Sequence, residues 1–147
     1  TEGRVLMLEG ARIFVDRWRS AGWTEDMIGR VVFTGRLPRE RYLTLLSLLP
    51  CTLGTYPWGE GVTALESFGV LTPVVILPEK ISVEKLTLGQ VRVLEVEELA
   101  VGGVEEYGAL AARLGNDEAF RAGIVERIER NLDRLWDVEG VAGEWAG

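Results

Sequence analysis

The chain has 147 residues, of which 47% are hydrophobic, so it can bury one sizeable core but is short for two full α/β domains. With a net charge of −7 and only 16 lysines and arginines, it offers no basic surface to a nucleic acid or an anionic membrane, and we expect neither partner. Cys51 is the only cysteine and histidine is absent, which disfavours metal sites and Ser/His/Asp catalysis.

The beginning of the sequence shows neither an initiating methionine nor a basic run before an apolar stretch. No apolar segment reaches the roughly 20 residues that a membrane-spanning helix needs. We therefore expect a single domain, residues 1–147, cut from a longer protein that is soluble and lies in the cytoplasm, the nucleus or both.

Short apolar runs alternate with helical patterns in the first half of the chain. Apolar residues at helical spacing over 11–21 stop at Gly22, and a second helical pattern begins at Pro38 and stops at Pro50. Between and after these helices the sequence predicts three strands, at residues 5–8, 31–34 and 51–55.

The second half continues the alternation and then becomes helical. A loop at 56–61 leads into a short predicted helix at 62–68 and an apolar strand at 74–77. Three further helices are predicted at 83–94, 104–114 and 117–135, with a short strand at 99–101. This order predicts an α/β fold with a Rossmann-like parallel sheet covered by helices on both faces and ending in C-terminal helices.

The most informative segment is the glycine-containing loop that follows a predicted strand and opens the helix at 62–68. Glycines at 59 and 61 let the backbone approach a ligand closely, and free N–H groups at Gly61, Val62 and Thr63 would face it at the positive end of the helix. A diphosphate fits there without a metal, and Glu66 can accept hydrogen bonds from ribose hydroxyls. The plainer alternative is a simple turn before a helix-stabilising glutamate.

The segments 30–42 and 55–77 resemble the C-terminal catalytic half of the O-linked N-acetylglucosamine (O-GlcNAc) transferase/SPINDLY family. That family has an Asp-Thr-x-Pro segment, a Thr-Thr pair and an acidic residue before Gly-x-Pro-Val-Val. The resemblance extends over residues 30–136, through Glu105-Glu106-Tyr107 and Phe120-Arg121. The residues in register within 55–77 are Thr55, Pro57, Gly59, Thr63, Glu66 and Pro73-Val74-Val75.

The resemblance implies the C-terminal domain of a GT-B glycosyltransferase, which binds a UDP-sugar without a required metal or other cofactor. By position it implies nucleotide contacts for Leu37, Arg39 and Tyr42. It also implies a phosphate cradle at Gly61, Val62 and Thr63, and ribose binding by Glu66. Tyr107 and Trp136 are expected to belong to the core.

Several positions depart from the family pattern. Val62 replaces the first threonine of the pair and removes one hydroxyl donor, while Gly54 stands where aspartate is usual. Leu71 replaces a glycine before the Pro-Val-Val strand, which can alter the turn. The family's histidine and acceptor-side groups belong to the N-terminal half of the catalytic region, so no catalytic residue is assigned here and the chain is expected to be inactive without that half.

These expectations leave several functions open. The first is transfer of N-acetylglucosamine from a UDP-sugar to Ser or Thr hydroxyls of an acceptor protein, with the N-terminal half of the catalytic region as partner. The alternative donor within the family is GDP-fucose, with SPINDLY-like transfer of fucose. A degenerate nucleotide-sugar-binding or scaffolding module and an unrelated flavodoxin-like interaction domain are the alternatives outside catalysis.

Overall fold

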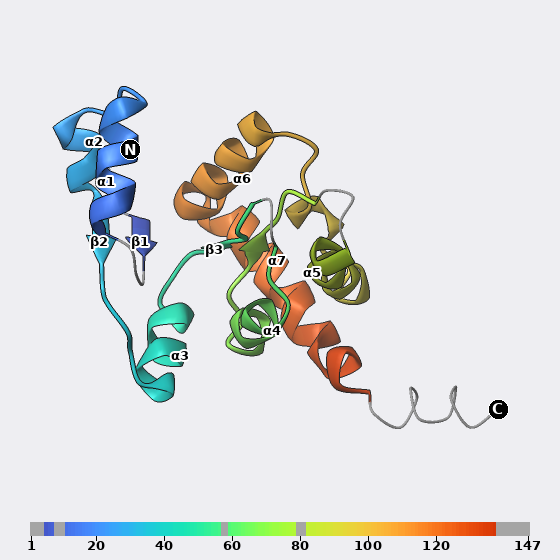
Figure 1. Cartoon of the computed structure of the whole chain (residues 1–147). Helices are drawn as coiled ribbons and strands as arrows, with labels where there is room; N and C mark the ends of the chain where they lie inside the picture. Colours follow the sequence, from blue (N-terminus) through green and yellow to red (C-terminus); the bar gives the residue numbers. More distant parts are fainter. Residues whose placement is uncertain (1–4, 8–10, 57–58, 79–81, 138–147) are drawn as a thin grey trace. The chain divides into compact units, whose positions relative to one another are not determined.

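The computed structural model describes residues 5–7, 11–56, 59–78 and 82–137 (Figure 1). The chain divides into two compact units, Thr1–Tyr42 and Leu43–Gly147. Helix α3 (Arg39–Ser47) contains the point of division. That the whole chain forms one domain therefore stays a prediction.

The first unit consists of two parallel strands with two helices between them in sequence. Strand β1 (Val5–Met7) pairs with β2 (Val31–Phe33), and both lie where the apolar runs predict strands. Helix α1 (Ala11–Ser20) ends as predicted at Gly22, which takes a φ of +86°. Helix α2 (Glu25–Gly29) was not predicted; the Thr24 hydroxyl caps it by accepting a hydrogen bond from the N–H of Met27.

The second unit contains a pair of parallel strands enclosed by helices. Strand β3 (Thr52–Leu53) pairs with β4 (Val74–Val75), and Ile76 forms a parallel bridge with Ala100, inside the predicted short strand at 99–101. The helices of this unit are α4 (Val62–Gly69), α5 (Ser82–Val93), α6 (Val104–Asn116) and α7 (Glu118–Asn131), with short 3-10 helices η1 (Glu97–Leu99) and η2 (Leu132–Trp136).

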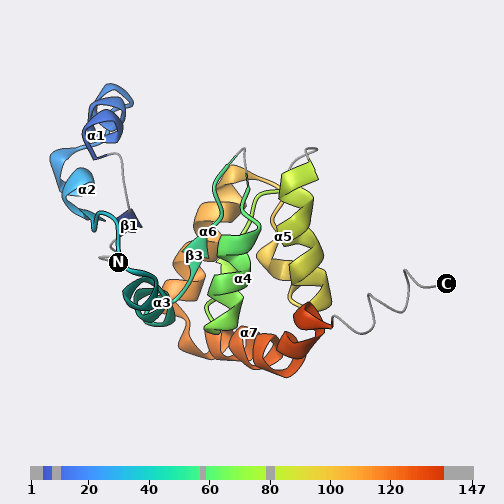
Figure 2. The ribbon, with the colours of Figure 1, turned by 60° about the horizontal axis from the view of Figure 1, so that its bottom comes forward.

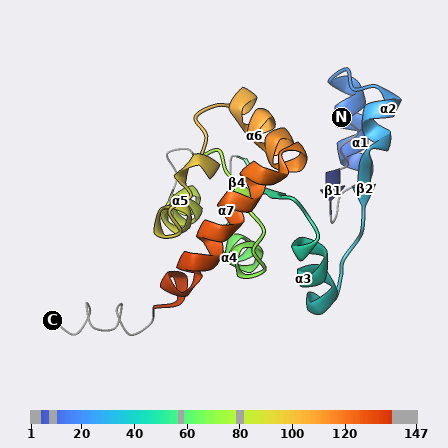
Figure 3. The same ribbon diagram turned by 180° about the vertical axis from the view of Figure 1, so that it is seen from behind.

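The core of this unit forms where the helices close over β4. Both β4 residues and Phe68 of α4 are fully buried, and α7 passes along one side of the strands, as the front and back views agree (Figures 1 and 3). Tyr107 is partly buried against this core, as predicted. The prediction was wrong for Trp136, which is 54% exposed because Leu132 and Leu135 are the residues of η2 that pack against the core.

Three helices end in the same way, although only one of them has a glycine to do so. After α4 and α5, the residues Leu71 and Glu95 take positive φ angles of 62° and 58°. The N–H groups of each and of its successor bond back to carbonyls of the last helical turn, as at Gly22. Leu71 therefore keeps the turn that a glycine would make, at the cost of a strained backbone.

The C-terminal end of α5 is held by side chains from α7 and η2. Asn131 is buried and donates from Nδ2 to the carbonyl of Leu94 over 3.0 Å. Arg127 donates to the carbonyl of Glu95 over 3.0 Å, and Arg134 pairs with the Glu95 carboxylate at 2.6 Å. The open carbonyls at the end of α5 thus find their donors about 40 residues later in the chain.

The fold is mixed α/β, mostly helical, with small parallel sheets. In the described residues the strands form two separate pairs, β1–β2 and β3–β4, and not one continuous sheet. Figure 2 shows α4, α5, α6 and α7 gathered around the β3–β4 pair. None of the helices in the described part of the chain is long and apolar enough to cross a membrane.

The strained turn after α5 leads to a first prediction. Replacing Glu95 with glycine relieves the positive φ and is expected to raise the free energy of unfolding by about 0.5–1 kcal/mol, measured by urea denaturation. Glu95→Gln is the matched control, because it removes the exposed ion pair with Arg134 and keeps the strain. A stability gain in Glu95→Gln equal to that in Glu95→Gly would contradict the strain.

Candidate functional site

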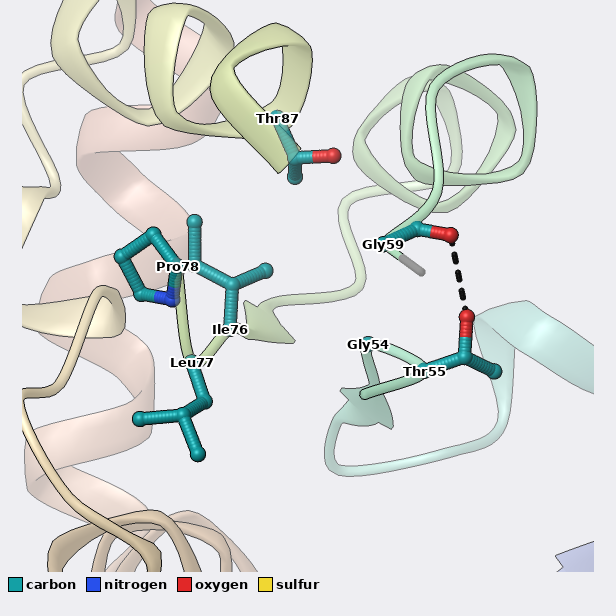
Figure 4. Close-up of a pocket in the computed structure, with 7 residues that line it drawn as sticks. All are labelled: Gly54, Thr55, Gly59, Ile76, Leu77, Pro78 and Thr87. Carbon is teal, nitrogen blue, oxygen red and sulfur yellow. Dashed lines mark hydrogen bonds between the residues drawn. The ribbon is translucent and has the colours of Figure 1, made fainter. Parts of the chain in front are cut away.

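A small pocket lies where both strands of the second unit end. Gly54 and Thr55 follow β3 on one side of it, while Ile76, Leu77 and Pro78 follow β4 on the other (Figure 4). Gly59 and, from α5, Thr87 complete the lining. The carboxyl ends of parallel strands are where α/β folds bind ligands. With about 230 Å³, part of it open solvent, the pocket is smaller than a typical small-molecule site.

The loop between β3 and α4 begins with a closed turn. The N–H of Gly59 donates to the carbonyl of Thr55, and the Thr55 hydroxyl donates to the carbonyl of Gly59 over 3.0 Å (Figure 4). Gly59 has a φ of +73°, so this position requires glycine or strain. Pro57, which belongs to the predicted family register, lies outside the described residues, as does Trp58.

Side chains from two helices hold the backbone of this loop. From α6, the Tyr107 hydroxyl donates to the carbonyl of Gly54 over 2.7 Å. From α5, Thr87 donates to the carbonyl of Glu60, and Gln90 donates from Nε2 to the carbonyl of Gly61 over 3.2 Å. We call Tyr107, Thr87 and Gln90 the loop clamp, because together they fix three carbonyls in the loop before α4 begins.

Close packing around residue 54 leaves little space for a side chain. Gly54 is buried, and a Cβ added there would lie 3.1 Å from both the carbonyl oxygen of Val75 and the side chain of Ile76. The aspartate that the family resemblance leads one to expect at this position would crowd the backbone of β4. The departure at Gly54 therefore fits the close approach of the two strands.

Four of the predicted site residues surround the start of α4. Gly61 is its N-cap and, as a glycine, brings no side chain to cap the first N–H groups. Val62 is 73% exposed and Thr63 is also exposed, while Glu66 lies one turn further along and is half-buried. The first N–H groups of α4 thus have no side-chain cap and lie among exposed residues, which is the arrangement that favours an anion.

The other three predicted residues belong to the first unit. Leu37 precedes α3 and is half-buried, while Arg39 is exposed at the start of α3 and Tyr42 lies half-buried one turn later. The predicted site residues thus fall into two sets, one in each unit. Contacts between the two sets of residues stay a prediction.

The residue that the sequence analysis missed is Glu60. Burial raises the pKa of its carboxyl to about 7, and its Oε1 atom is buried without a hydrogen-bond partner among the described residues. Its neighbour Tyr107 also has a raised pKa, first through burial and then through Glu60 and Cys51. Burial likewise raises the pKa of the Cys51 thiol to about 11. Burial in this part of the site therefore opposes the charged form of each of these groups.

Within the described residues, no group of three or more Cys, Asp or Glu side chains is placed to hold a metal ion. The sequence contains no histidine that could add to such a group. The start of α4 offers backbone N–H groups, the Thr63 hydroxyl and the Glu66 carboxylate to a ligand.

Comparison with known proteins finds a similar fold among solved structures and no match by sequence. No family model matches the chain, and no curated protein matches it by sequence. Among solved structures, a mutant of the Thermobaculum terrenum O-GlcNAc transferase matches with a TM-score of 0.75 and 23% identity, over 87% of this chain and 24% of that protein. The resemblance to O-GlcNAc transferase is thereby confirmed for the fold, and the chain spans about a quarter of that protein's length.

The loop clamp yields a second prediction. Replacing Tyr107 with phenylalanine keeps the ring and leaves the buried carbonyl of Gly54 without its donor, so the free energy of unfolding should fall by about 1–3 kcal/mol. Thr55→Val removes an exposed hydroxyl that also donates to a loop carbonyl, and water can replace it, so a loss below about 0.5 kcal/mol is expected. Equal losses in urea denaturation would argue against the clamp.

Proposed function

We propose that this chain is the nucleotide-sugar-binding part of a glycosyltransferase similar to O-GlcNAc transferase. The observation that carries the proposal is the uncapped start of α4, presented by a clamped loop at the carboxyl ends of β3 and β4. The likeness in fold to an O-GlcNAc transferase supports it. The finer form of the proposal places these strands in the Rossmann-like sheet of a GT-B domain.

The diphosphate of the donor would lie against the N-terminus of α4. The N–H groups of Gly61, Val62 and Thr63 and the Thr63 hydroxyl are the donors proposed for it, aided by the positive end of the helix dipole. Because loop carbonyls are tied to α5 and α6, the loop needs little reordering when a ligand arrives, which favours affinity.

Two sets of residues are proposed to recognise the nucleoside that is attached to the diphosphate. Glu66 is half-buried one helical turn from the phosphate donors, and its carboxylate suits the ribose hydroxyls. Leu37, Arg39 and Tyr42 are proposed to contact the nucleotide and its base. This part of the proposal requires the two units of the chain to face the same ligand.

Transfer of the sugar needs more than the groups in this chain. The leaving diphosphate must be neutralised and the acceptor hydroxyl must be positioned and deprotonated. The proposed site supplies part of the first requirement and none of the second. We therefore propose that Ser and Thr hydroxyls of a protein are glycosylated, in the cytoplasm or nucleus, only when the N-terminal half of the catalytic region completes the cleft.

A second candidate is binding without turnover. It is favoured by Val62, which is 73% exposed at the position where a phosphate-binding hydroxyl is expected. A SPINDLY-like preference for GDP-fucose uses the same phosphate site and differs in the base and sugar. The flavodoxin-like interaction domain predicts no nucleotide affinity at all, so nucleotide titration separates it from the other candidates.

Nucleotide binding is the third prediction. Calorimetric titration of the chain with UDP should give saturable binding that a Thr63→Ala, Glu66→Ala double variant weakens about 10- to 100-fold, since it loses hydrogen bonds to charged or buried partners. Titration with GDP in parallel distinguishes the two donors.

The double variant must first show wild-type circular dichroism and unfolding. Equal UDP affinity in both folded proteins would contradict the proposed phosphate and ribose site at the start of α4. If neither protein binds UDP or GDP, release of nucleotide from sugar donors by the full-length parent is the deciding measurement.

The fourth prediction concerns the replaced threonine and the absence of a metal requirement. Val62→Thr restores a hydroxyl beside the phosphate and should strengthen UDP binding about fivefold, whereas Val62→Ala should change it little. Chelation with EDTA should leave both affinities unchanged. A loss of binding on adding EDTA would contradict the metal-free site.

A further inference from the structure

Two acceptor atoms are buried beneath the loop before α4 without a donor. They are Oε1 of Glu60 and Oε1 of Gln90, and no described residue hydrogen-bonds either of them. Both residues take part in hydrogen bonds of the loop clamp through other atoms. Thr87 donates to the carbonyl of Glu60, and the amide nitrogen of Gln90 donates to the carbonyl of Gly61. Buried acceptors without donors are costly, and an ionised carboxylate among them is the most costly.

The Glu60 carboxyl lies against Gly54, on the side where a side chain of residue 54 would begin. An ideal Cβ built on Gly54 would lie 3.4 Å from Oε1 of Glu60, which is van der Waals contact. The carboxyl is thus next to a residue that lines the pocket, and it is near Tyr107. The Glu60 backbone is held by Thr87, which donates to its carbonyl, so the side chain starts from a fixed point.

We propose that the Glu60 carboxyl is a proton-dependent anchor of the loop that presents the N-terminus of α4. In its neutral form it stays buried behind Gly54 and keeps the loop in the binding arrangement. When it ionises, the carboxylate leaves the buried place for water and the loop loses that support. Glu60 is a positioning residue in this proposal, since its buried oxygen has no access to a ligand.

Among the described residues, no cation is found to compensate a charge on Glu60, and burial is the cause that raises its pKa. From α6 the neighbour is Tyr107, which in turn interacts with Cys51; burial raises the pKa of both, so both are neutral near pH 7. The cation Arg121 interacts with Cys51. From α5 the contacts are Thr87 and Gln90, which carry no charge.

The direction of the pH effect follows from these surroundings. Burial raises the pKa of Glu60 from 4.5 to about 7, so the folded chain binds the proton more tightly than the unfolded chain does. The stability that Glu60 contributes is therefore complete below pH 4.5 and is lost as the pH rises through about 7. Donor binding at α4, which rests on the proposed function, should weaken over the same upper range.

The test compares the chain with its Glu60→Gln variant, in which an amide replaces the neutral carboxyl. Glu129→Gln, at an exposed position of α7, is the matched control. Urea unfolding between about pH 5 and pH 8 should show the midpoint falling with pH in the wild type and in Glu129→Gln. The Glu60→Gln midpoint should be higher than theirs at the upper end of this range and should fall less.

The same three proteins are then titrated with UDP-GlcNAc, whose diphosphate keeps its charge over this range. If only the neutral form of Glu60 supports binding, wild-type affinity should fall about tenfold between about pH 6 and pH 8, while Glu60→Gln changes less than about twofold. Parallel pH profiles of unfolding in wild type and Glu60→Gln would overturn the anchor. A difference in unfolding without UDP-GlcNAc binding at any pH would support the anchor and contradict the proposed function.

Discussion

Backbone carbonyls that turn inward at the end of a short strand need donors, and in this chain α5 and α6 provide them. The loop between β3 and α4 directs the carbonyls of Gly54, Glu60 and Gly61 toward the helices, where Tyr107, Thr87 and Gln90 bond them. The start of α4 has a glycine as its N-cap, so the N-cap residue offers no side chain to the first backbone N–H groups. The proposed binding capacity follows from this difference. The loop carbonyls are hydrogen-bonded inside the protein, whereas the first N–H groups of α4 are the donors proposed for a ligand.

Much of the fold could be predicted from periodicity. The strands and the helices α1, α3, α4, α5, α6 and α7 lie close to the positions that the apolar spacing indicates, since each buries one face. Helix α2 was missed because five residues are too few for a period, although Thr24 and the acids after it are a helix-start signal. The extent of the sheet was harder to predict, because strands of two or three residues depend on partners that no local pattern reveals.

The sequence predicted which residues lie at the start of α4, but not the contacts that hold the loop before it. Glycines before a helix indicated the start of α4, and the structure brings Gly61, Val62, Thr63 and Glu66 together there. Burial of Glu60 could not be read from the sequence, since an acid between two glycines usually faces water. The roles of Thr87 and Tyr107 depend on contacts between residues 27 and 53 positions apart.

The C-terminal end of α5 illustrates how far such dependence extends along the chain. Its last carbonyls are bonded by Asn131 and Arg127, and Arg134 binds the residue that closes the turn. Because α5 also carries Thr87 and Gln90, the loop over the pocket depends indirectly on residues 127–134. During synthesis on the ribosome, the buried hydrogen bond from Asn131 to the carbonyl of Leu94 can form only after Asn131 has emerged from the exit tunnel.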